Sequence, residues 1–129
     1  MLIENSTKYK VKVSEIEPKT DRGGEVYVLL SPTTVDMKNL IMGIGITPVN
    51  GKVTEHVHNY SEECFFVVKG MGILHLGNGC TISFEVGSAV RVPQGIRHWV
   101  ENTGTEELHV VFASGPLAPS PEIGHKNFE

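Results

Sequence analysis

The sequence lacks the features that mark exported and membrane proteins. Only two cysteines, Cys64 and Cys80, occur among its 129 residues, and two thiols without an export signal are more often free than paired. The N-terminal segment MLIENSTKYKVKVSEIEPK holds no apolar run between its charges, which argues against a signal peptide. No run approaches the roughly 20 apolar residues that span a bilayer. We therefore expect a cytoplasmic protein with no membrane partner.

Clusters of positive charge are also missing. The chain has a formal net charge of −4, and its 11 lysines and arginines are scattered along its length. This distribution does not indicate a basic patch of the kind that binds nucleic acid. With 40% hydrophobic residues, the chain is able to build one core of ordinary size. We predict a single domain over residues 1–129.

Helical periodicity is scarce, and short runs rich in Val, Ile, Leu and Phe recur between glycines and prolines. This pattern predicts an all-β sandwich or barrel, and the GNGC sequence at Gly77–Cys80 predicts a hairpin turn. The barrel is expected to span about residues 25–114, with an N-terminal arm at 1–20 and a Pro-rich C-terminal arm at 115–129. The expected strands are Val26–Leu30, Leu40–Thr47, Val53–His58, Cys64–Val68, Gly72–Leu76, Thr81–Glu85, Ala89–Val92, His98–Glu101 and Leu108–Ala113.

The stretch EHVHNYSEEC holds a candidate metal site. Side chains alternate faces along a strand, so His56 and His58 point the same way, with Cβ atoms about 6.5–7 Å apart. Two imidazoles at this spacing are able to converge on one ion. A turn over Asn59–Glu62 would bring Glu63 beside them at the start of the next strand. Taken alone, the pair is a weak signal, and such a pattern is more often two histidines at a solvent-exposed strand end.

A second stretch, GSAVRVPQGIRHWVEN at Gly87–Asn102, supplies another histidine. A strand ends there at Pro93, Gly95 permits a sharp turn, and His98 opens the next strand. A turn of this kind directs His98 back across the sheet.

Together these two stretches resemble the paired motifs of the cupin superfamily. The first motif corresponds to Gly51–Gly70, where Gly51 lies one residue closer to the first histidine than usual, and the second corresponds to Gly87–Asn102. The resemblance implies a double-stranded β-helix, or jelly-roll barrel. It also implies one divalent metal ion per chain, held by His56, His58, Glu63 and His98.

The identity of the ion stays open. Three imidazoles and a carboxylate suit Zn, Fe, Mn, Ni, Co or Cu. Glu62 is a rival carboxylate, but the spacing to Gly70 in the motif favours Glu63.

Strand alternation also predicts the surroundings of the ion. If Glu63 points inward, then Phe65 and Val67 point inward too. If His98 points inward, then Val100 does as well. Phe112 is expected to join this apolar pocket. Four other residues are assigned to packing or to the surface: His75, His109, His125 and Trp99.

A closer resemblance concerns the chemistry. The stretches DRGGEVYVLLSPTTV, HVHNYSEECFFVVKG and GPLAPSPEIGH are similar to small cupins encoded with bacterial aromatic polyketide synthases, whose members are called polyketide cyclases. This similarity, from about Arg22 to His125, implies metal-assisted ring closure of a poly-β-keto small molecule. In such a reaction the α-proton is taken either by a metal-bound hydroxide or by a displaced ligand such as His58.

Other functions stay open at this point. One barrel fold hosts many reactions, and an Fe(II) dioxygenase acting on an enolisable or thiol substrate is an alternative enzyme. A non-catalytic module that binds a small ligand or a metal is an alternative of a different class.

Two further expectations concern surfaces. Phe66, Val68 and Trp99 are expected to form an outer apolar surface, which predicts a homodimer. The tail over Gly115–His125 is expected to pack on the barrel or the partner, since its prolines need little ordering entropy and Leu117 and Ile123 gain from burial.

Overall fold

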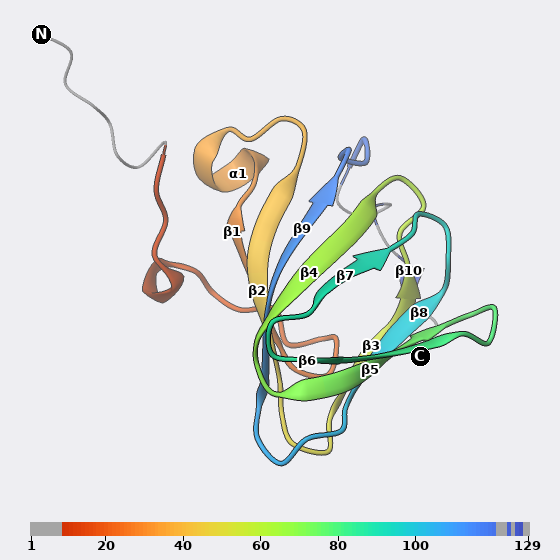
Figure 1. Cartoon of the computed structure of the whole chain (residues 1–129). Helices are drawn as coiled ribbons and strands as arrows, with labels where there is room; N and C mark the ends of the chain where they lie inside the picture. The colour runs from red at the N-terminus through yellow and green to blue at the C-terminus, as the bar shows by residue number, and fades with distance from the viewer. Residues whose placement is uncertain (1–8, 121–123, 125, 128–129) are drawn as a thin grey trace, which may run out of the picture.

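The structure is a computed structural model that describes residues 9–120, 124 and 126–127. Two antiparallel five-stranded sheets make up the barrel (Figure 1). This is the all-β jelly-roll arrangement predicted from the sequence. The first sheet has the order β1-β2-β9-β4-β7 and contains β1 (Glu25–Leu30), β2 (Ile41–Thr47), β9 (Leu108–Gly115), β4 (Glu62–Lys69) and β7 (Ala89–Val92).

The second sheet carries most of the residues of interest for function. Its order is β10-β3-β8-β5-β6, so β3 and β8, which are far apart in sequence, lie side by side. The sheet contains β10 (Lys126–Asn127), β3 (Lys52–Val57), β8 (His98–Asn102), β5 (Met71–Leu76) and β6 (Thr81–Glu85).

The predicted strands agree with the observed ones to within two residues at each end. One difference affects the site, because β3 ends at Val57 and His58 follows it. Three elements were not predicted, and the first of them is a 3-10 helix η2 (Val13–Glu15). A short helix α1 (Pro32–Val35) is capped by the Ser31 hydroxyl, which accepts from the Thr34 amide at 3.3 Å. Strand β10 is only two residues long and pairs with β3.

The core lies between the two sheets. The ring of Phe65 on β4 meets that of Phe84 on β6 edge to face, with centroids 5.2 Å apart. Leu74 and Val67 are completely buried, and truncating a buried leucine to alanine costs about 2–5 kcal/mol. The buried cluster contains Phe65, Val67, Leu74, Phe84, Val90, Val92 and Leu108.

Strand β3 contains a bulge that aims its side chains. Val53 pairs with Val100 and His56 pairs with His98, so β3 uses one more residue than β8 over the same distance. In a regular strand, Val53 and His56 would face opposite sides. Because of the bulge, both line the inside of the barrel.

The predicted turns form as expected. The GNGC turn joins β5 to β6, where Gly79 has φ +90° and the Leu76 amide donates to the carbonyl of Cys80 at 2.9 Å. At the far end of β8, the buried Asn102 side chain donates to the carbonyls of Thr47, Pro48 and Glu106 at 3.0–3.1 Å, and so it ties the turn between β2 and β3 to the turn between β8 and β9.

The described parts of the C-terminal tail contact the chain's own barrel. The Ser61 hydroxyl donates to the carbonyl of Pro116, and Lys126 and Asn127 pair with β3. Leu117 is half-buried, whereas Ile123 lies outside the described residues. Within the part of the chain that the structure describes, no helix is long and apolar enough to cross a membrane.

Candidate metal centre

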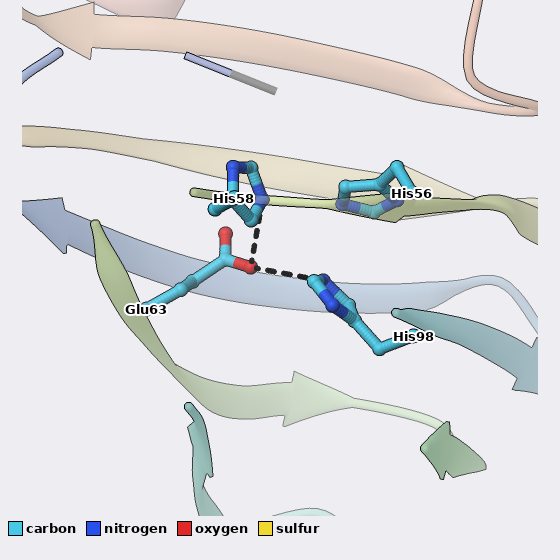
Figure 2. Close-up of side chains that lie close together, drawn as sticks. All are labelled: His56, His58, Glu63 and His98. Atoms are coloured by element: carbon cyan, nitrogen blue, oxygen red, sulfur yellow. Dashed lines mark ion pairs between the residues drawn. The ribbon is translucent and has the colours of Figure 1, made fainter. Parts of the chain in front are cut away.

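Four side chains from three segments meet inside the barrel. His56 on β3 and His98 on β8 are buried, and His58 and Glu63 are largely shielded from solvent. One nitrogen of each histidine and one carboxylate oxygen all lie within 4.8 Å of one another. Figure 2 shows the three imidazoles and the carboxylate pointing toward a common centre. The four residues predicted from the sequence are therefore brought together.

The loops around the site fix the relation between the two histidine-bearing segments. The amide of Gly95, which has φ +78°, donates to the carbonyl of His58 at 2.8 Å. The Gln94 side chain donates to the carbonyl of Asn59 at 2.7 Å. The turn before β8 is thus tied to the turn after β3, and this connection brings His98 next to His58.

Backbone carbonyls orient the imidazole rings. Nδ1 of His56 lies 2.6 Å from the carbonyl of Thr54, and Nδ1 of His98 lies 2.9 Å from that of Ile96. Nδ1 of His58 lies 3.4 Å from the carbonyl of Gly124. Since a carbonyl only accepts, these contacts place the proton on Nδ1 and leave Nε2 as a lone-pair donor.

The Nε2 atoms face the carboxylate. Oε1 of Glu63 lies 3.6 Å from Nε2 of His58 and 3.8 Å from Nε2 of His98 (Figure 2). Nε2 of His98 is buried and has no hydrogen-bond partner among the described residues, which is costly unless something binds it. Three imidazole nitrogens and one carboxylate suit a divalent transition metal, so the residues present fit such an ion.

Burial shifts the protonation of these groups. Together with the neighbouring His98, it lowers the pKa of His56 to about 3. Burial also lowers the pKa of His98. The same cause raises the pKa of Glu63 to about 7, against the opposing charge of Arg22. Neutral imidazoles are ready to ligate near neutral pH, whereas Glu63 must lose its proton to do so.

A cavity of about 90 Å³ is lined by three of the four residues, His56, Glu63 and His98. Phe65 and Val100 line it, as the alternation of the strands predicted, and Phe112 lines it too. Val67 does not line the cavity. It lies one inward position further along β4 than Phe65 and is fully buried in the core cluster, deeper than the cavity.

The remaining candidates lie away from the site. Glu62 is exposed, so Glu63 is the carboxylate that faces the histidines. The His75 ring stacks on that of Trp99, with centroids 3.8 Å apart, and its Nε2 contacts Glu101 at 3.0 Å. His109 contacts the carboxylate of Glu107 at 3.1 Å on an exposed position. His125 lies outside the described residues.

The sequence did not predict one charged residue of the cavity. Arg22 lines the same cavity as His56, Glu63 and His98 although it precedes the first strand. The signal was present in the DRGG stretch, where an arginine stands beside two glycines. A glycine pair often marks a close backbone approach, but the sequence did not show which part of the barrel this arginine meets.

Comparisons with known proteins agree with this geometry. The sequence profile of the cupin domain matches residues 44–114. The chain is 40% identical over 119 residues to the "polyketide synthase CurC" of Streptomyces cyaneus, covering 92% of this chain and 77% of that protein. It is 35% identical to the "tetracenomycin polyketide synthase protein TcmJ" of Streptomyces glaucescens, covering 93% and 80%.

A solved structure shares the fold. The polyketide cyclase RemF from Streptomyces resistomycificus superposes with a TM-score of 0.71 at 17% identity, covering 100% of this chain and 87% of that one.

Proposed function

Because the chain belongs to the cupin family and is related to polyketide synthase proteins, we propose that it is a metal-dependent cyclase of poly-β-keto compounds. In this proposal one divalent transition-metal ion is held by His56, His58, Glu63 and His98. The observation that carries it is that one nitrogen of each histidine and one carboxylate oxygen lie within 4.8 Å of one another, with Nε2 of His58 and of His98 facing Oε1 of Glu63.

The chemistry follows from the kind of site. A divalent ion bound there supplies Lewis-acid stabilisation of negative charge on a substrate oxygen. The apolar side chains of Phe65, Val100 and Phe112 line part of the cavity, and a low local dielectric strengthens electrostatic interactions. His58 is more exposed than His98, with 12% against 2% of its side chain accessible. We therefore propose His58 as the ligand that would leave the ion and accept an α-proton.

The cavity limits how much of the substrate it holds. Its volume of about 90 Å³ is well below the roughly 300–1,000 Å³ of sites that enclose a drug-sized ligand. One keto–methylene–keto unit fits beside the four residues, and the rest of a longer chain would extend through the mouth. The proposal therefore places one reacting unit of the chain at the ion.

The first test is metal content. Elemental analysis of protein purified without a nickel column should find about one equivalent of one transition metal per chain. Protein that folds normally and takes up no metal from Zn, Fe, Mn, Ni, Co or Cu solutions would rule out a metal-dependent cyclase.

The second test is turnover. Metal-loaded protein should convert a poly-β-keto thioester to a cyclised aromatic product under nitrogen as fast as in air, and metal-free protein should not. A requirement for oxygen would identify a dioxygenase instead. Tight binding of the substrate without turnover under either atmosphere would identify a non-catalytic binding module.

A further inference from the structure

Arg22 enters the barrel from a small closed loop. The amide of Lys19 donates to the carbonyl of Val26 at 2.8 Å, and the amide of Val26 donates back at 2.9 Å. This pair of bonds closes the loop over residues 20–25. The carbonyl of Arg22 accepts from the amide of Thr54 on β3 at 3.0 Å, so the backbone of Arg22 is attached to the strand that carries His56.

Two glycines allow this close approach. Gly23 has φ +93°, and a Cβ at this position would overlap the carbonyl of Lys52 on β3. A Cβ on Gly24 would overlap the carbonyl of Ile46 on β2. The loop is therefore pressed against both sheets, and the position of Arg22 is set by backbone contacts rather than by a long flexible segment.

The Arg22 side chain lies within the electrostatic field of the candidate metal centre. It shares one cavity with His56, Glu63 and His98. Burial lowers its pKa, and the charges of Asp21 and Glu63 raise it. An arginine nevertheless remains charged in proteins, so this cavity contains a fixed, partly desolvated cation.

The charges that line the cavity determine which ligand charge it favours. With a divalent ion in place, the ion and Arg22 together would carry three positive charges, and Glu63 would supply one negative charge. The three histidines are neutral when they ligate. Asp21 is exposed, so water screens its charge. A ligand that brings its own negative charge would therefore be favoured over a neutral one of the same shape.

We propose that Arg22 is a substrate-binding residue that recognises an anionic oxygen of the ligand beside the metal centre. The ligand class is a small 1,3-dioxygen anion, such as an enolate or a carboxylate of a β-dicarbonyl unit. The planar guanidinium binds such oxygens through two parallel N–H donors. This assignment rests on the proposed metal-dependent function and narrows its substrate class.

The test uses two probes of the same shape and different charge. Malonate is a 1,3-dioxygen anion, and malonamide is its neutral counterpart. Isothermal titration on zinc-loaded wild-type protein should show that malonate binds more tightly than malonamide. Arg22→Gln should weaken malonate binding by about tenfold or more and leave malonamide binding unchanged.

Two variants act as controls. Arg22→Lys keeps the charge but loses the paired donors, so its malonate affinity should fall between those of wild type and Arg22→Gln. Asp21→Asn changes an exposed charge next to Arg22 and should leave malonate affinity within twofold. Elemental analysis of each variant should find the same zinc content.

The outcomes separate the two proposals. A wild-type protein that binds no metal overturns the proposed function. If wild type binds zinc, the assignment of Arg22 is overturned by any of three results: no preference for malonate, unchanged malonate affinity in Arg22→Gln, or a loss that follows zinc content. If Arg22→Gln does not fold, Arg22→Lys decides, and malonate affinity within twofold of wild type overturns the assignment.

Discussion

His56 and His98 face each other directly across the antiparallel pair of β3 and β8, with ring centroids 4.3 Å apart. They are neighbours because β3 and β8 are adjacent in the sheet although β4 to β7 intervene in the chain. This cross-strand pair forms a rigid base for the site, because each ring is also held through its Nδ1 by a backbone carbonyl.

We expect that His98→Ala lowers bound metal by about tenfold or more, because it removes one of four ligands. Glu63→Ala should do the same. Glu62→Ala is the matched control, since Glu62 is exposed and adjacent in sequence, and it should keep the metal. Elemental analysis after dialysis measures this. Loss of metal in Glu62→Ala together with retention in Glu63→Ala would show that the carboxylate is wrongly assigned.

We predict that the metal-free protein is stabilised by Glu63→Gln, and that the gain grows with pH. The pKa of Glu63 is raised from 4.5 to about 7 in the folded state, so the folded chain keeps a proton that the unfolded chain has already lost. Stability from this group is therefore fully present below pH 4.5 and is lost as pH rises to about 7. The lowered pKa of His56 changes stability with pH in the opposite direction. Because both proteins contain His56, its contribution cancels in the comparison.

Melting temperatures of metal-free wild type and Glu63→Gln measure this difference. The difference between the two melting temperatures should increase between pH 4.5 and about pH 7 and then stay constant. In the presence of zinc the order should reverse, because the glutamine amide of the variant is a poorer ligand than a carboxylate. A gap that does not change with pH would show that Glu63 has an ordinary pKa.

The C-terminal tail is expected to support His58. Removing residues 119–129 deletes β10 and the carbonyl of Gly124, which lies 3.4 Å from Nδ1 of His58. We expect metal affinity to fall by about tenfold, less than for His58→Ala. Competition with a chromogenic chelator measures the affinity, and Lys126→Ala is a control that keeps the tail backbone. Unchanged affinity after truncation would show that the tail does not orient the ligand.

The homodimer stays a prediction, and the structure indicates where it would form. Phe66 and Val68 on β4 are 47% and 49% exposed. Trp99 is on β8 in the other sheet and stacks on His75, so it does not extend this surface. We expect wild type to scatter light at twice 14.1 kDa and Phe66→Glu to be monomeric. Ile82→Glu, an exposed apolar position on β6, is the control, and a monomeric wild type would contradict the prediction.

Gly23→Ala is predicted to be more destabilising than Gly79→Ala. Both glycines have nearly the same positive φ, +93° and +90°, so both substitutions incur the same left-handed cost of about 1–2 kcal/mol. Only at Gly23 does the new Cβ overlap a backbone carbonyl, that of Lys52, whereas no atom lies within 4 Å at Gly79. Urea unfolding of the two variants measures the difference. Equal losses would show that the loop carrying Arg22 is not tightly packed.

Much of the fold was predictable because its signals are local. Strand alternation and turn residues act over a few neighbours, so the strands and the turns at Gly79 and Gly95 follow from nearby sequence. The spacing to Gly70 in the cupin motif favoured Glu63 over Glu62, and in the structure Glu63 lies with the histidines whereas Glu62 is exposed. Alternation also gave the inward direction of Val67, but it does not give how deep the cavity extends along β4, and Val67 lies in the core rather than in the cavity lining.

The sequence by itself determined the two sheets' strands and the residue types of a candidate metal centre. Only the tertiary structure decided three further features. These are the bulge that turns both Val53 and His56 inward, the placement of Gly124 beside His58, and the entry of Arg22 into the cavity. Each depends on backbone contacts between segments far apart in the chain, such as the bond from Thr54 to Arg22. Local patterns carry no information about such contacts, because the contacts exist only once the sheets have closed around a common core.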